Sequence, residues 1–214
     1  FMHDEYSDIA QNHSHGDIVV WPLKALALYL QTTGDLKILT EKVPYLTAKN
    51  KPAVIQGTVT EHIEKALDRI EHEFISGTSL IRYGGGDWDD SLQPVNSELA
   101  NRMVSAWTVA LLAQSLEELD ASLDDSDLKK RIATLSERVR TDFRRHVLID
   151  GQVAGFLLYD EELKIAEPLL HPNDTRTGIK NRLIPMTRSI IAGLLTREEA
   201  DDQMERIANN LKYP

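Results

Sequence analysis

Apolar residues recur at steps of three and four along most of this chain, the spacing that places them on one face of an α-helix. The clearest stripe begins after Thr58 and ends at Gly77. Its expected inward side chains are Ile63, Ala66, Leu67, Ile70 and Phe74. A chain with this dominant period folds into packed helices, and strand patterns are scarce, so we expect an all-α fold.

Similar patterns predict helices elsewhere in the chain. They cover residues 17–30, 96–119, 183–194 and 196–211, with one more helix that begins at Asp125 or Ser126 and extends to Val147. In the first of these, the expected inward face consists of Ile18, Trp21, Ala25, Leu28 and Tyr29. Leu36, Ile38, Leu39 and Val43 form a short pattern that Pro44 ends, and residues 151–159 look extended. Met103 and Trp107 are expected in the core, and the run Arg144, Arg145 and His146 at a solvated helix end.

Charge and composition exclude several classes of partner. The 214 residues carry 34 acidic and 24 basic side chains, and the net charge of -10 argues against nucleic acid or an anionic membrane. No apolar run approaches the roughly 20 residues of a membrane helix. The chain has no cysteine, which suits a reducing, cytoplasmic location. His13 and His15 have no matching third ligand, so we expect no metal.

The loop at residues 77–94 interrupts every helical period and contains the most informative stretch, GGGDWDD. Three glycines lead into Asp87, Trp88, Asp89 and Asp90. An indole face can support the apolar face of a sugar ring, and a carboxylate can bind hydroxyl groups or protonate a glycosidic oxygen. The alternatives are a solvated acidic turn or a calcium loop, but an EF-hand would need a glutamate at its twelfth position, which is absent.

This stretch resembles the Gly-Asp-Trp-Asn/Asp-Asp motif of glycoside hydrolase family 94, the inverting cellobiose-phosphorylase-like enzymes. Residues 13–23, HSHGDIVVWPL, are similar to the Ser-Asp-Asp segment of that family. Residues 29–45 resemble the family stretch that follows it. Residues 177–193 are like the branch that includes 1,2-β-oligoglucan phosphorylases. The resemblance covers nearly the whole chain, and its motifs occur in the expected order.

The resemblance implies an (α/α)6 toroid, or six-hairpin barrel. Such a barrel needs about a dozen helices, and the sequence predicts roughly half of them. We therefore expect residues 1–214 to be one incomplete segment of the catalytic barrel, with the general-acid loop at 77–94 and no second domain. The family's phosphate-binding histidines would lie outside this segment, which would be inactive alone.

Family roles transfer to three residues of the sequence. Asp90 matches the general acid, Trp88 the tryptophan that lines the sugar subsite, and Asp17 an aspartate that binds the non-reducing sugar. Asp87, Asp89 and His15 are expected to add substrate contacts. Where cellobiose phosphorylases have an arginine before that aspartate, this chain has Gln11, Asn12, His13 and His15, so amide or imidazole groups replace a charged fork.

The implied reaction is inverting phosphorolysis of a β-linked glucose disaccharide or oligosaccharide to α-glucose 1-phosphate. Inorganic phosphate would be the co-substrate of this glycosyltransferase-type phosphorylase, with no other cofactor, and the enzyme would be a homodimer. Two alternatives remain open from the sequence. One is an inverting hydrolase with Asp90 as acid and another carboxylate as base, and the other is a non-catalytic helical fragment that binds a glycan.

Overall fold

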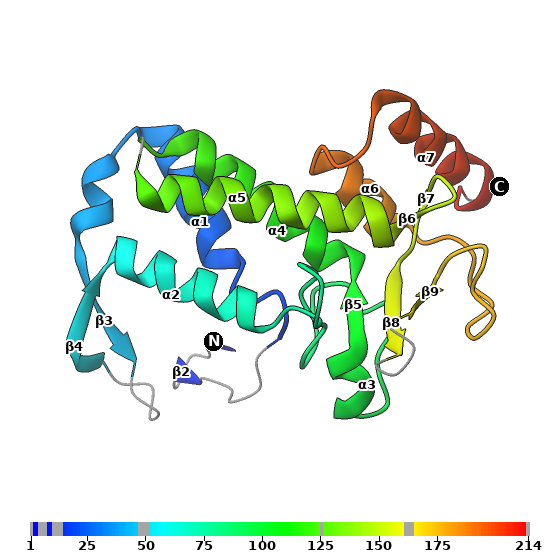
Figure 1. Ribbon diagram of the computed structural model, residues 1–214, viewed down its shortest axis with the longest axis horizontal. Coiled ribbons are helices and arrows are strands. Elements are labelled where there is room, and N and C mark those ends of the chain that lie inside the picture. Colours follow the sequence, from blue (N-terminus) through cyan, green and yellow to red (C-terminus); the bar gives the residue numbers. More distant parts are fainter. Residues whose placement is uncertain are drawn as a thin grey trace.

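The computed structural model describes residues 2–3, 8–9, 15–46, 52–124, 126–160 and 165–212 of the chain. Helices dominate this part of the molecule (Figure 1). Its α-helices are α1 (Trp21–Thr33), α2 (Val59–His72), α3 (Ser97–Arg102), α4 (Ala106–Ser122), α5 (Asp127–Asp142), α6 (Leu183–Ile191) and α7 (Arg197–Asn210). A 3₁₀ helix, η1, spans Leu36–Thr40, and a π-helical turn, η2, spans Phe143–Val147. None of these helices is long and apolar enough to cross a membrane.

Short strands lie between the helices, so the expected all-α class is wrong. An incomplete (α/α)6 toroid of helices alone is therefore wrong as a full description of this chain. The described residues form four small antiparallel sheets. They pair β1 (Met2–His3) with β2 (Asp8–Ile9), β3 (Lys42–Leu46) with β4 (Pro52–Thr58), β6 (Leu148–Ile149) with β7 (Gln152–Val153), and β8 (Phe156–Asp160) with both β5 (Met103–Ser105) and β9 (Ile165–Leu169). These strands have two to seven residues, too few for a clear two-residue period.

Strand β5 interrupts the helix expected over residues 96–119. Met103 lies opposite Leu158 of β8, and Ser105 lies opposite Phe156. All three side chains of β5 are buried. The apolar spacing continues through Met103 to Trp107 without a break, and the partner strand lies more than 50 residues away. Local periodicity therefore gave no sign that α3 and α4 are separate helices.

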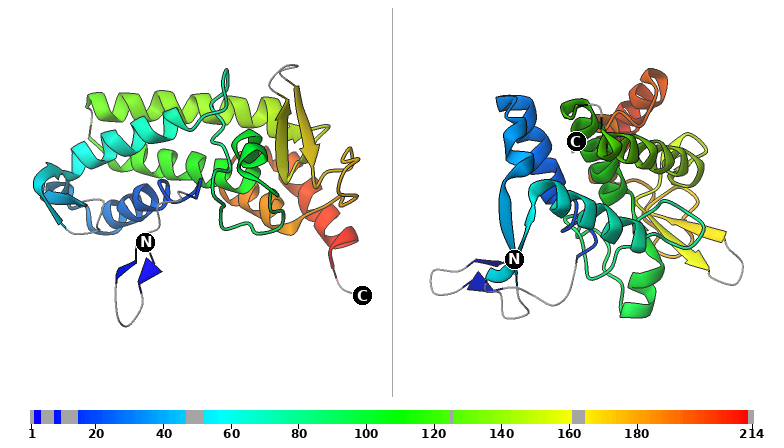
Figure 2. Two further views of the ribbon diagram at one scale, coloured as in Figure 1. Left: turned by 90° about the horizontal axis from the view of Figure 1, so that it is seen from below. Right: turned by 60° about the vertical axis from the view of Figure 1, so that its left-hand side comes forward.

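Helix α4 is the centre of the main core. Eleven of its residues are buried, from Ala106 to Leu119. It packs against α1, α5 and α6 (Figure 1), and the second set of views shows α6 and α7 at the opposite end of the molecule from the β3–β4 hairpin (Figure 2). An ion pair between Lys24 and Glu118 links α1 to α4 at the edge of this core.

Helix α1 turns a different face to the core from the one expected. Leu23, Ala27 and Leu30 are buried. The expected inward residues Ile18, Trp21, Leu28 and Tyr29 are among the exposed large hydrophobic side chains, and Ala25 is exposed as well. Apolar residues surround this helix on several sides, so spacing alone cannot select the buried face.

A second, smaller core lies beneath the loop that carries the GGGDWDD stretch. It consists of Tyr83, Ala100, Met103, Phe156, Leu169 and Leu170. The rings of Tyr83 and Phe156 meet edge to face, with centroids 5.9 Å apart. The backbone N–H of Tyr83 also donates to the carbonyl of Met103 at 2.8 Å. The loop is thereby attached to the three-stranded sheet before it reaches its carboxylates.

The remaining helix signals of the sequence are confirmed. In α2, Ile63, Leu67 and Ile70 are buried on the expected stripe. Ser126 caps α5 at the predicted start of that helix, and Ile132, Leu135 and Val139 are buried on its inner face. Helix α7 begins after Thr196 as predicted, and Thr196 and Glu199 form a capping box there.

We expect Thr58→Ala to lower the free energy of unfolding by about 1 kcal/mol. The Thr58 hydroxyl accepts from the N–H of Glu61 at 3.1 Å, and Glu61 accepts from the N–H of Thr58 at 2.7 Å, so alanine removes half of a capping box. Urea unfolding measures the loss. Thr32→Ala, an exposed change inside α1, serves as control, and an equal loss in both variants would contradict the capping argument.

Candidate active site

Burial alternates along the carboxylate stretch. Asp87 is 4% exposed and Asp89 is fully buried, whereas Trp88 is 66% exposed and Asp90 is also exposed. Of the four predicted site residues in this stretch, the carboxylates of Asp87 and Asp89 therefore form a buried inner pair. The indole of Trp88 and the carboxylate of Asp90 form an outer pair that faces solvent.

Asp87 attaches the loop to helix α4. Its carboxylate accepts a hydrogen bond from the hydroxyl of Thr108 at 2.8 Å and another from the backbone N–H of Asp89 at 2.8 Å. Burial raises the pKa of Asp87 to about 7, and the nearby charges of Asp89 and Asp17 add to this effect. At neutral pH the carboxyl group of Asp87 is therefore partly protonated, and it holds the loop against α4.

Asp89 attaches the other end of the stretch. Its carboxylate accepts from the backbone N–H of Ser91 at 3.2 Å and from the Ser91 hydroxyl, and Arg182 donates to that hydroxyl oxygen at 2.7 Å. Burial raises the pKa of Asp89, the charge of Asp90 raises it further, and Ser91 and Arg182 act in the opposite direction. Asp90 lies between Asp89 and Ser91, which are bonded to each other, so its backbone position is set from both sides.

The Asp90 side chain faces solvent. Its carboxylate accepts one hydrogen bond, from Nε2 of Gln93 at 2.8 Å. Such a carboxyl group is open to an approaching substrate and can transfer a proton to an oxygen atom placed against it.

Trp88 is supported from behind by two other tryptophans. Its ring stacks on that of Trp107, with centroids 6.1 Å apart and planes 20° apart, and Trp107 lies 5.9 Å from Trp21. Trp107 is buried in the main core, which confirms the expectation for that residue. The guanidinium of Arg188 lies 5.7 Å from the centroid of the Trp107 ring. Trp88 is therefore an exposed platform on a rigid base.

The segment of His15 and Asp17 docks against the same loop. The N–H of Gly16 donates to the carbonyl oxygens of Tyr83 at 3.1 Å and Gly86 at 2.8 Å. A Cβ on Gly16 would lie 2.6 Å from the Arg82 carbonyl oxygen, so only glycine allows this approach. Asp17 is buried and accepts from the indole N–H of Trp21 at 3.0 Å. His15 is exposed and forms a bridge with Gly84.

All six predicted site residues thus lie on two segments that contact each other, but sequence reasoning missed the residues that hold them. These are Gly16, Ser91, Thr108 and Arg182. Gly16 offered a weak local signal, as a glycine beside an expected site residue. Arg182 lies 91 positions from Ser91, and no local pattern links the two. Gln11, Asn12 and His13 lie outside the described residues.

An exposed carboxylate beside an exposed indole offers a hydrogen-bonding group and an apolar face, the two kinds of contact that a sugar ring can make. Residues 3–214 match the profile of the glycosyl hydrolase 94 superfamily, catalytic domain, and the chain belongs to this family. The resemblance found in the sequence is therefore confirmed.

Individual relatives agree with this assignment. The chain is 44% identical over its whole length to a 1,2-beta-oligoglucan phosphorylase of Listeria innocua serovar 6a, and it covers 20% of that protein. It is 30% identical over 94% of its length to a solabiose phosphorylase of Paenibacillus borealis, covering 25%. It is also 37% identical over 47% of its length to the cyclic beta-(1,2)-glucan synthase NdvB of Rhizobium meliloti, covering 4%. The chain thus spans a quarter or less of these relatives.

We expect Asp87→Asn to flatten the pH dependence of stability. The pKa of Asp87 is higher in the folded state than its ordinary value of 3.8, so the folded state binds the extra proton between about pH 4 and 7. Stability should fall by roughly 2 to 4 kcal/mol as pH rises through this window, and the asparagine variant should lose most of that fall. Urea unfolding at pH 4.5 and pH 8 measures it. The surface variant Asp127→Asn should keep the original slope, and an unchanged slope in Asp87→Asn would refute the assignment.

We expect Gly16→Ala to weaken the contact between the two segments and to cost about 1 to 3 kcal/mol of stability, because its methyl group would meet backbone carbonyl oxygens. Urea unfolding followed by tryptophan fluorescence measures the loss, since Trp21 and Trp88 lie on the two segments. His15→Ala adds no volume beside the same backbone and serves as the matched control. Equal stability of Gly16→Ala and the parent would show that the close approach is not required.

Proposed function

We propose that a protein with this chain as part of its catalytic domain carries out inverting phosphorolysis of a β-linked glucose oligosaccharide, with Asp90 as general acid. The observation that carries the proposal is the exposed Asp90 carboxylate beside the exposed Trp88 ring, on a loop fixed by buried Asp87 and Asp89. Two phosphorylases among its relatives support the reaction class. Because the chain spans a fifth of the first of them, the activity is proposed for a protein of that greater length.

In the proposed reaction, the protonated carboxyl group of Asp90 donates its proton to the glycosidic oxygen as the bond from that oxygen to the anomeric carbon breaks. A phosphate oxygen attacks the anomeric carbon from the opposite face. Inversion of the β linkage gives an α-sugar 1-phosphate and a shortened glycan. Phosphate is already a nucleophile, so this reaction needs no carboxylate base to activate water. Inorganic phosphate is the co-substrate, and no organic cofactor takes part.

The other residues have distinct proposed roles. Trp88 stacks against a sugar ring, since its ring is exposed and backed by Trp107. Asp17 and His15 contact sugar hydroxyl groups from the neighbouring segment. Asp87 and Asp89 act on the substrate through the loop, because their buried carboxylates are engaged by Thr108 and Ser91.

One of these relatives supports a narrower proposal for the substrate. The 44% identical relative is named for a 1,2-β-linked oligoglucan, and we propose that linkage for the substrate here. A neutral glycan is compatible with the net charge of -10, because binding it does not require a basic surface.

In the full-length protein, we expect Asp90→Asn to lower kcat by about 10²- to 10⁴-fold with a 1,2-β-linked glucan oligosaccharide, because the amide cannot donate the proton. Trp88→Ala should mainly raise KM, because it removes a stacking surface. Phosphate-dependent release of glucose 1-phosphate measures both, with Asp127→Asn on the surface of α5 as the matched control.

Two results would contradict the proposal. Release of glucose at a rate that does not depend on phosphate concentration would indicate an inverting hydrolase. Full turnover by Asp90→Asn, with correct folding shown by an unchanged unfolding curve, would remove Asp90 from the chemistry and leave a glycan-binding loop.

A further inference from the structure

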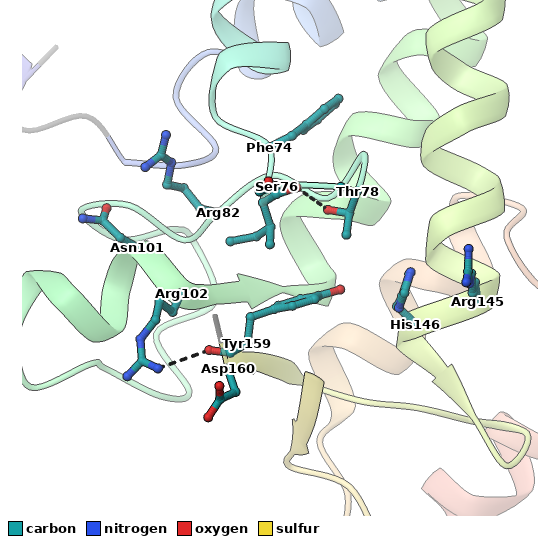
Figure 3. A pocket seen from close by; sticks show the side chains of 12 residues that line it. Phe74, Ser76, Thr78, Arg82, Asn101, Arg102, Arg145, His146, Tyr159 and Asp160 are labelled. Atoms are coloured by element: carbon teal, nitrogen blue, oxygen red, sulfur yellow. Dashed lines mark hydrogen bonds between the residues drawn. The ribbon is translucent and has the colours of Figure 1, made fainter. Parts of the chain in front are cut away.

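A cavity lies away from the carboxylates of the loop at residues 77–94. It has a volume of about 690 Å³ and is formed by the segment that follows α2 (residues 74–78), Arg82, the end of α3, the π-helical turn η2 and the end of β8. Polar side chains dominate its lining (Figure 3), chiefly Arg82, Asn101, Arg102, Arg145, His146 and Tyr159. None of the six predicted site residues lines it.

Tyr159 provides the strongest sign of a ligand. Its side chain is 7% exposed, and its hydroxyl is buried without a hydrogen-bond partner among the described residues. In Figure 3 that hydroxyl points toward the side of the cavity formed by Thr78 and His146, and the rings of His146 and Tyr159 lie 6.3 Å apart. Burial raises the pKa of Tyr159 to about 12, so the hydroxyl keeps its proton and can donate. A buried donor without an acceptor is costly, unless a bound group supplies one.

The arginines of the cavity also have spare donors. Nη1 of Arg102 donates to the backbone carbonyl of Tyr159 at 3.3 Å (Figure 3), but Nε is buried and has no hydrogen-bond partner in the described part of the chain. Its nearest ion-pair partner, Glu98, is 3.7 Å away and mostly exposed. Arg145 forms no ion pair with any described residue and lies beside His146 on η2 (Figure 3). Arg82 differs, because it is paired with Glu73 at 2.6 Å.

Acidic groups near the cavity do not use up these donors. Asp160 lines one edge, next to Tyr159 in the sequence. Asp142 lies 4.0 Å from Nε2 of His146, and burial holds the pKa of His146 below its ordinary value. The cavity therefore has an excess of donors over acceptors, contributed by Tyr159, Arg102 and Arg145.

We propose that this cavity binds a phosphate group, free or carried on a sugar, through the hydroxyl of Tyr159 and the guanidinium groups of Arg102 and Arg145. A guanidinium can donate two parallel hydrogen bonds to a phosphate, and phosphate oxygens are the acceptors that the cavity lacks. The volume falls in the range of small-ligand sites and exceeds the needs of one inorganic phosphate, which favours a sugar phosphate.

The position of the cavity connects it to the acid loop. Thr78 and Arg82 line the cavity and belong to the same loop, residues 77–94, that carries Asp90. A ligand bound there would contact the first half of the loop and leave its carboxylates free. The site is thus separate from the proposed reaction centre, although both lie on one segment.

The test is calorimetric titration of the chain with glucose 6-phosphate, inorganic phosphate and glucose at constant ionic strength. We expect saturable binding of glucose 6-phosphate, weaker binding of phosphate, and none of glucose. Tyr159→Phe and Arg145→Gln should each weaken binding about tenfold. Tyr159→Phe removes a hydroxyl that has no partner, so its unfolding curve should match or exceed that of the parent. Tyr29→Phe and Arg197→Gln are exposed control changes outside the cavity and should leave binding unchanged.

The other possible results either support the proposal or overturn it. Tighter binding of inorganic phosphate than of glucose 6-phosphate supports the site with free phosphate as its ligand. Absence of binding for both phosphate compounds overturns it. So does binding that survives Tyr159→Phe and Arg145→Gln intact, and so does binding that Trp88→Ala abolishes, because that result would place the ligand at the acid loop.

Discussion

The hydrogen bond from Thr108 to Asp87 connects the buried central helix α4 to the loop at residues 77–94, and the rest of the site depends on this connection. Helix α4 is buried over most of its length and packs against α1, α5 and α6, so three neighbouring helices fix its position. Thr108 lies in the first turn of that helix. Because the loop is tied to α4 at this point, the direction of Trp88 and Asp90 follows from the packing of the core.

Buried carboxylates are an unusual way to hold a loop, because burial disfavours their charged form. Asp87 and Asp89 nevertheless give the loop several acceptors at once. Asp87 takes donors from Thr108 and from the Asp89 backbone, and Asp89 takes donors from Ser91. These bonds fix the backbone on both sides of Trp88 and Asp90. The raised pKa values of the inner pair are the physical consequence of this arrangement.

Much of the fold and of the site could be predicted from local sequence. Helices α2, α5 and α7 follow apolar residues three and four positions apart, so local spacing predicted them. The face of α1 could not be predicted, because apolar residues lie around the whole helix. Strand β5 was missed for a different reason, since its pairing with β8 joins residues more than 50 positions apart.

The sequence by itself determined which residues are available to the site, in the GGGDWDD stretch and the HGD segment before α1, and the family to which the chain belongs. Only the tertiary structure decided which carboxylates face solvent, because burial depends on what packs behind the loop. It also brought Arg182 to Ser91 and gathered Arg102, Arg145 and Tyr159 around one cavity. Residues so far apart in the chain share no local pattern, and they meet only when the core fixes the elements that carry them.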